Sequence, residues 1–279
     1  MRKLRTAFQG EPGAFSQEAV RQLLGDRAVV APLQRFDEVF RALADRKVDA
    51  AVVPIENTLA GSVHENYDHL LEYDVRIVAE TNVRIVHNLI VRPGVRFRDL
   101  RRVFSHPVAL NQCLGFFAAH PEIERVPYYD TAGSVKMIVR DGLNDAGAIA
   151  SSVAASIYEA RILRRSIEDD RHNYTRFFLL RRTRDAKRLD APGGQWKTSI
   201  VFSTRNIPGA LFRAISAFAL RDLNLTRIES RPLRGRPWEY LFYVDFIGNL
   251  EDQRVGNAMN HLRELADMLR VLGCYPRGE

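Results

Sequence analysis

Short apolar runs alternate with segments of helical periodicity over roughly the first 180 residues, and this alternation constrains the fold most strongly. Apolar runs at 4–8 and 50–53 predict buried strands, and between them residues 36–43 carry apolar side chains at positions i, i+3, i+4 and i+7. Strands that alternate with helices are typical of an α/β domain with a mainly parallel sheet. The same pattern continues downstream, with strands predicted at 83–91, 102–104 and 146–150 and helices after Pro107, Gly133 and Ser151.

Four strand ends in this part of the chain are followed by loops rich in Gly, Ser, Thr or Asn. They are GEPGAFS at 10–16, PIENTLAGS at 54–62, SHPVALNQC at 105–113 and DTAGS at 130–134. We expect each loop to lead into a helix and to present N–H and hydroxyl groups at the carboxyl edge of a sheet, where open α/β folds bind ligands. One such loop alone is explained by helix capping. Four together predict a cleft for a carboxylate-bearing ligand.

A second domain is predicted after a polar, glycine-containing stretch. The predicted boundaries are 1–182 for the first domain, 183–196 for a linker and 197–279 for the second domain. The second domain has the element order βαββαβ, which is typical of a ferredoxin-like fold. Its strands are predicted at 198–203, 224–230, 239–247 and 269–275, and its helices at 208–221 and 253–265.

Composition and spacing argue against several classes of function. The 41 basic residues are interleaved with 34 acidic ones, so the net charge of +7 does not predict nucleic-acid binding. No apolar run approaches the roughly 20 residues of a membrane span, no signal peptide is evident, and we expect a cytoplasmic protein. Cys113 and Cys274 lack the spacing of metal ligands, and His64 and His69 lack that of a zinc helix. Neither GxGxxG nor a P-loop occurs, so we expect no metal and no cofactor.

The motifs of the chain, taken together, resemble those of the prephenate dehydratase family. They are GEPGAFS, PIENTLAGSVHENYD, SHP, DTAG and NYTRF, with PGALF and ESRP in the second domain. Thr58 stands where the family commonly has serine, and Phe212 where many members have an aliphatic residue. The resemblance implies a two-lobed catalytic domain like the type II periplasmic binding proteins, followed by an ACT domain. It also implies a monofunctional enzyme, since the chain opens on the first catalytic strand.

The family's reaction explains the residue types. Prephenate loses a ring carboxylate and a ring hydroxyl, so the protein has to anchor the pyruvyl carboxylate, exclude water and hydrogen-bond the departing oxygen. Thr175 is expected to donate to that oxygen, directly or through a water. Arg176 is expected to clamp a carboxylate or to hold an acid such as Glu56, and Phe177 to wall the site. For the cleft residues that the motifs add, a purely structural capping role remains the alternative: Glu56, Asn57, Ser105 and Gln112.

The resemblance further implies that L-phenylalanine binds the second domain and inhibits the enzyme, at an interface in a homodimer or homotetramer. The residues expected to bind it are Gly209, Ala210, Leu211, Phe212, Glu229, Ser230, Arg231 and Pro232. Two other functions stay open. Arogenate, which carries an amino group in place of the keto oxygen, would fit the same cleft, and a non-catalytic sensor of small acids would share the lobed fold.

Overall fold

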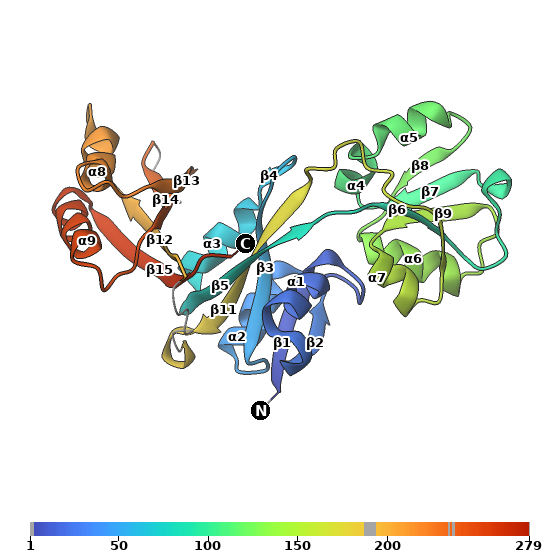
Figure 1. The fold of residues 1–279 in the computed structure, drawn as a ribbon, viewed down its shortest axis with the longest axis horizontal. Helices are drawn as coiled ribbons and strands as arrows, with labels where there is room; N and C mark the ends of the chain where they lie inside the picture. The colour runs from blue at the N-terminus through green and yellow to red at the C-terminus, as the bar shows by residue number, and fades with distance from the viewer. Residues whose placement is uncertain (1–2, 187–193, 234, 236–237, 279) are drawn as a thin grey trace. The chain divides into compact units, whose positions relative to one another are not determined.

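The computed structural model describes residues 3–186, 194–233, 235 and 238–278, and the part of the predicted linker at 187–193 lies outside them. The chain forms two compact units. The first unit comprises Met1–Tyr73 and Thr81–Leu179, and the second comprises Asp74–Glu80 and Leu180–Glu279. Figure 1 traces the elements of both units along the chain.

The first lobe of the first unit is built on a sheet in which β11, β3, β1 and β2 are neighbours in that order. Strand β1 pairs in parallel with β2 and with β3, because the intervening helices return the chain to the same edge. The predicted strands at 4–8 and 50–53 and the helix at 36–43 are confirmed. The elements of this lobe are β1 (Leu4–Gln9), α1 (Phe15–Leu24), β2 (Ala28–Leu33), α2 (Phe36–Ala44), β3 (Ala50–Asn57), β4 (Gly61–Ser62), α3 (His64–Glu72) and β11 (Tyr174–Arg182).

The second lobe contains a five-stranded sheet of order β10-β6-β9-β7-β8. Strand β7 is parallel to β8 and β9, whereas β6 runs antiparallel to β9 and β10. Its core packs side chains such as Leu89, Val103, Phe117 and Ile149 between sheet and helices. The elements are β6 (Asn88–Val91), β7 (Arg102–Ser105), α4 (Pro107–Asn111), α5 (Leu114–Ala119), β8 (Glu124–Pro127), α6 (Thr131–Arg140), β9 (Ala146–Ala150), α7 (Ser152–Ile157) and β10 (Arg161–Arg164).

Two sequence predictions are corrected in this unit. Residues 83–91 are not one strand: β5 (Val75–Arg84) ends before β6 begins, because the chain leaves the first sheet here and pairs with β9 of the second. The segment 54–62 does not lead directly into a helix either. Strand β3 continues to Asn57, and β4 turns back to pair with it before α3 starts.

The second unit has the predicted βαββαβ order, with β13, β14, β12 and β15 as neighbours in an antiparallel sheet. Helices α8 and α9 pack on the sheet through a core that includes Ile200, Phe218, Val244 and Leu262. The elements are β12 (Trp196–Ser203), α8 (Ala210–Ala219), β13 (Leu225–Pro232), β14 (Tyr240–Ile247), α9 (Gln253–Leu265) and β15 (Met268–Pro276). Among the described residues, no helix is long and apolar enough to cross a membrane.

Candidate active site

A cavity of about 480 Å³ lies in the first unit, where the four predicted loops come together. Gln9 and Asn57 end strands of the first lobe, whereas His106 and Tyr129 follow strand ends of the second lobe. The loops thus meet at carboxyl ends of strands, as expected for a ligand site in an α/β fold. The lining residues are Gln9, Ala14, Phe15, Ser16, Phe36, Asn57, Ala60, Gly61, Ser62, Val63, Ile85, His87, His106, Val108, Ala109, Gln112, Tyr129, Asp130, Thr131 and Thr175.

The side-chain amide of Asn57 has a fixed orientation. Its Oδ1 accepts hydrogen bonds from the backbone N–H groups of Leu59 (3.0 Å) and Ala60 (2.8 Å) in the turn before β4. Because those partners are donors only, the other end of the amide is Nδ2, which donates to Thr175 Oγ1 at 2.9 Å and to Asn173 Oδ1 at 2.7 Å. The hairpin therefore sets which way Asn57 faces β11.

Thr175 lies on β11 at the cavity wall and is 9% exposed. Since Asn57 occupies its oxygen as a donor, the hydroxyl hydrogen of Thr175 remains available to donate to another group. A hydroxyl held in this way is a positioned neutral donor rather than an ionised group.

Gln112 connects α4 to both strands that cross between the lobes. Its Oε1 accepts from Asn173 Nδ2 at 2.9 Å and lies 2.8 Å from His87 Nε2, while its Nε2 donates to Asn57 Oδ1 at 3.5 Å. Asn57, Gln112 and Thr175 are therefore three predicted residues that the structure brings together at the cavity.

The other predicted catalytic residues do not line the cavity. Arg176 points to the opposite face of β11 from Thr175, because successive side chains alternate along a strand. On that face its guanidinium group donates to Glu56 at 3.2 Å and lies over the ring of Phe178. Phe177 is 2% exposed and packs in the core. Ser105 is fully buried and donates to the carbonyl of Ile149 at 2.7 Å.

Comparison with known proteins identifies the family. The model of the family described as prephenate dehydratase matches residues 6–185, which is more than half of the chain. The chain belongs to the prephenate dehydratase family. The model of the ACT domain matches residues 198–264, so the βαββαβ unit is an ACT domain.

Three relatives of this dehydratase-family chain cover nearly all of it. An Arabidopsis thaliana protein named arogenate dehydratase/prephenate dehydratase 2, chloroplastic, is 45% identical over 98% of this chain and 73% of its own length. The structure of a prephenate dehydratase from Arthrobacter aurescens in complex with L-Phe is 32% identical, with a TM-score of 0.89 over 98% of this chain and 90% of that one. The structure of GqqA, described as a novel type of quorum quenching acylase, is 34% identical, with a TM-score of 0.89 over 98% and 97%. The expected cytoplasmic location stays a prediction.

Some cavity residues of the dehydratase unit carried no sequence signal. His87 was placed inside a continuous strand, and its contacts to Gln112 and to Glu168 join positions far apart in the chain. Tyr129 and Lys136 both donate to Glu11, at 2.8 and 2.9 Å, and so tie the second lobe to the first loop. No pattern in the sequence predicted the contact of Tyr129 and Lys136 with Glu11.

The cavity has a mixed apolar and polar lining that, over its described residues, lacks strongly basic side chains. None of the described residues that line it is a lysine or an arginine. Burial raises the pKa of the Asp130 carboxyl group, although this group caps α6 by accepting from Gly133 N at 2.7 Å. Burial lowers the pKa of both His87 and His106, which favours neutral imidazoles. An anionic ligand would therefore be held mainly by neutral donors such as the hydroxyls of Ser16 and Thr131.

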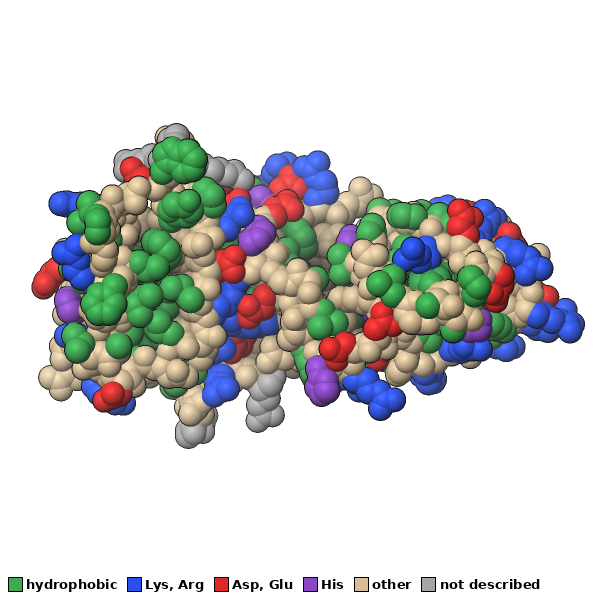
Figure 2. Space-filling model, turned by 90° about the horizontal axis from the view of Figure 1, so that it is seen from above, with side chains coloured by type: hydrophobic (Ala, Val, Ile, Leu, Met, Phe, Trp, Pro, Cys, Tyr) green, Lys and Arg blue, Asp and Glu red, His purple; other side chains and the backbone are tan. Residues whose placement is uncertain are grey.

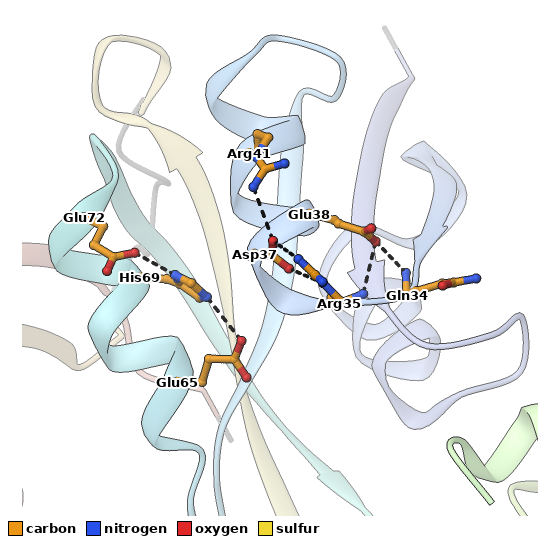
Figure 3. Close-up of polar contacts among 8 residues, drawn as sticks. All are labelled: Gln34, Arg35, Asp37, Glu38, Arg41, Glu65, His69 and Glu72. Atoms are coloured by element: carbon orange, nitrogen blue, oxygen red, sulfur yellow. Dashed lines mark hydrogen bonds and ion pairs between the residues drawn. The ribbon is translucent and has the colours of Figure 1, made fainter.

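A charged cluster on α2 and α3 lies outside the lining (Figure 3). Arg35 and Arg41 both pair with Asp37, and His69 lies between Glu65 and Glu72 at 3.5 and 3.0 Å. The partners of Asp37 lie on α2 or directly before it, and those of His69 lie on α3, so these contacts are local to each helix. Within the described part of the chain, no group of three or more His, Cys, Asp or Glu side chains is arranged to hold a metal ion.

Proposed function

We propose that this protein converts prephenate to phenylpyruvate, carbon dioxide and water, with arogenate as the alternative substrate. The observation that carries the proposal is the Thr175 hydroxyl, which the amide of Asn57 leaves as a donor at the wall of the cavity. Arogenate is kept as the alternative substrate because the name of the Arabidopsis thaliana relative includes both activities.

The reaction needs one proton to be delivered to a leaving oxygen. The bond between the ring and its carboxylate breaks, and the electron pair enters the ring as carbon dioxide departs. The bond between the ring and the hydroxyl oxygen breaks at the opposite carbon, and that oxygen departs with the electron pair of the bond and takes up a proton from solvent to become water. Thr175 donates a hydrogen bond to the departing oxygen and lowers the cost of the charge that develops there. Aromatisation supplies the driving force, so the chemistry uses no cofactor.

Neutral hydrogen-bond donors suit prephenate, because its ring carboxylate loses its charge when carbon dioxide departs whereas its pyruvyl carboxylate stays ionised. In the proposed arrangement the pyruvyl carboxylate is anchored by Ser16, Thr131 and the N–H groups at the start of α1, whose N-terminal residue Ala14 has no side-chain cap. The carboxylate that departs gains most from a site without a cation, because a nearby positive charge would stabilise its ionised form.

The residues outside the lining have supporting roles in this proposal. Arg176 and Glu56 form an ion pair between β11 and β3, which carry Thr175 and Asn57. Ser105 joins the end of β7 to β9 through its bond to Ile149, and Phe177 is buried in the core two residues after Thr175 on β11. Each acts by holding the wall rather than by contacting substrate.

Regulation is proposed to occur in the ACT domain, with L-phenylalanine bound between two chains. Gly209 adopts φ of +75° at the start of α8, a conformation that favours glycine, and in the proposed arrangement this helix start receives the carboxylate of phenylalanine. Glu229 pairs with Arg227 at 3.2 Å on β13, so its carboxylate already has a cationic neighbour there. The relative from Arthrobacter aurescens is described in complex with L-Phe.

Exposed apolar side chains on the ACT domain support a contact between copies. Figure 2 shows hydrophobic side chains gathered on this unit. Phe212 is 77% exposed and Leu220 is 73% exposed, and exposed apolar side chains that form a contiguous patch often mark a contact with another chain. Among the described residues of this unit, the other exposed large apolar side chains are Ile207, Ile228, Trp238, Tyr240 and Leu250.

The test of the proposed function is the ultraviolet absorbance of phenylpyruvate formed from prephenate, with and without a metal chelator. We expect activity in both conditions and none without protein. A protein that binds prephenate but forms no product would support the sensor alternative and would contradict the proposal.

A further inference from the structure

His87 lies where the chain crosses from the first lobe to the second, between β5 and β6. Its backbone N–H donates to Glu168 Oε2 at 2.9 Å, and its carbonyl accepts from Ile167 N at 2.9 Å. The neighbouring crossing strand is held beside it by a bond from Ile85 N to the Asn173 carbonyl at 2.8 Å. The ring is 2% exposed and meets the edge of Phe15. The position of His87 is therefore fixed by both crossing segments.

The protonation of its ring follows from a chain of hydrogen bonds that starts at backbone amides. The turn N–H groups fix Asn57 Oδ1 as an acceptor, so Asn57 Nδ2 donates to Asn173 Oδ1. Asn173 Nδ2 then donates to Gln112 Oε1. Because that oxygen can only accept, His87 Nε2, at 2.8 Å, has to carry a hydrogen.

The contact of Nε2 with Gln112 is what favours the ring form with hydrogen on Nε2, because the second ring nitrogen of His87 makes no competing hydrogen bond within the described part of the chain. His87 Nδ1 is buried and has no hydrogen-bond partner among the residues that the structure describes. If the ring carried its hydrogen on Nδ1 alone, two acceptors, His87 Nε2 and Gln112 Oε1, would face each other at 2.8 Å. The hydrogen bond between His87 and Gln112 would then be lost. The donor function of Nε2 is thus what the site uses.

We propose that His87 is a positioning residue of the dehydratase site, whose Nε2–H holds the Gln112 amide in the orientation that the hairpin sets through Asn57 and Asn173, and so reinforces, from the far end of the network, the arrangement that leaves the Thr175 hydroxyl free to donate. This inference rests on the proposed function, because it assigns Thr175 to the departing oxygen. His87 itself contacts no reacting atom in this scheme.

The kinetic test compares two substitutions. His87→Phe keeps a ring against Phe15 but removes the donor, and we expect kcat to fall by about 10- to 100-fold with a smaller change in KM. His87→Gln carries an amide N–H at a similar reach and should restore most of the lost kcat. His69→Gln, on α3 outside the cavity, is the matched control and should leave kcat close to the wild-type value.

A double-mutant cycle separates positioning from general destabilisation. If His87 acts through Thr175, His87→Phe should change kcat by less than about twofold in the Thr175→Ala background. Equal kcat for His87→Phe and wild type, or an undiminished effect of His87→Phe without the Thr175 hydroxyl, would overturn the proposal.

A measurement without turnover distinguishes failure of this inference from failure of the proposed function. Nitrogen-15 NMR of the histidine-labelled wild-type protein should show a His87 ring with hydrogen on Nε2 and a bare Nδ1. Hydrogen on Nδ1 alone would refute the positioning role even in an active enzyme. A wild-type protein inactive on both substrates but with the expected ring form would instead refute the dehydratase activity, and the role of His87 at Thr175 with it.

Discussion

The amide nitrogen of Asn57 donates to the hydroxyl oxygen of Thr175 at 2.9 Å, and the direction of this bond is set by the backbone of the β4 hairpin. The bond joins the end of β3 to the start of β11, two strands 118 positions apart in sequence. Its consequence is chemical, because a hydroxyl that accepts from one side is left to donate on the other.

Removal of the Thr175 hydroxyl should impair the chemical step more than binding. We expect Thr175→Ala to lower kcat by about 10²-fold or more, with a smaller change in KM, since the contact forms mainly in the transition state. Thr175→Ser keeps the hydroxyl and is the matched control. Steady-state kinetics decide the matter, and a folded Thr175→Ala protein with near-normal kcat would remove Thr175 from the mechanism.

Reversing the direction of the hydrogen bond between Asn57 and Thr175 should lower kcat about as much as removing the Thr175 hydroxyl. Asn57→Asp is nearly isosteric and keeps an acceptor for the turn amides, but the second oxygen accepts where Nδ2 donates, so the Thr175 hydroxyl would turn towards the new carboxylate. We expect kcat to fall by about 10²-fold and the melting temperature to fall as well, because the new carboxylate oxygen faces Asn173 Oδ1, so kcat is compared at a temperature where both proteins are folded. Equal kcat in Asn57→Asp and wild type would show that the direction of this bond does not matter.

His87 should make stability depend on pH below its ordinary pKa of 6.5. Burial lowers the pKa of His87 in the folded state, so the unfolded chain binds the proton first as pH falls. Its contribution is present above pH 6.5 and is lost as pH falls towards the folded pKa, with a slope of at most about 1.4 kcal/mol per pH unit. Melting temperatures between pH 8 and pH 5 should therefore drop less in His87→Gln than in wild type, and parallel curves would contradict this assignment.

Inhibition by phenylalanine should depend on the backbone at the start of α8. Gly209→Val introduces a side chain at φ of +75° beside the expected ligand, and we expect inhibition to weaken by about tenfold or more. Gly142→Val is the matched control, because Gly142 has φ of +66° and open space around it in the other unit. Calorimetry and inhibition curves measure both variants; a monomeric protein, or unchanged inhibition of Gly209→Val, would count against a site between two chains.

The sequence predicted regular elements well where periodicity was strong and contacts were local. Helix α9 runs over the predicted residues 253–265, because its apolar stripe and its termini are both evident in sequence. The apolar run at 83–91 was misassigned because a crossing between two sheets has the same composition as one strand. Alternation along β11 separates Thr175 from Arg176, and this follows from strand geometry. The role of His87 did not follow, since its partners come from positions 112 and 168.

The most direct test of the central claim is a competition between equimolar prephenate and arogenate, followed by chromatography of phenylpyruvate and phenylalanine at early times. The ratio of the two products equals the ratio of kcat/KM for the two substrates. We predict that phenylpyruvate is the major product and that the rates of formation of both products fall by about 10²-fold or more in the Thr175→Ala protein. Phenylalanine as the major product would identify an arogenate dehydratase, and formation of neither product by the folded wild-type protein would contradict the account.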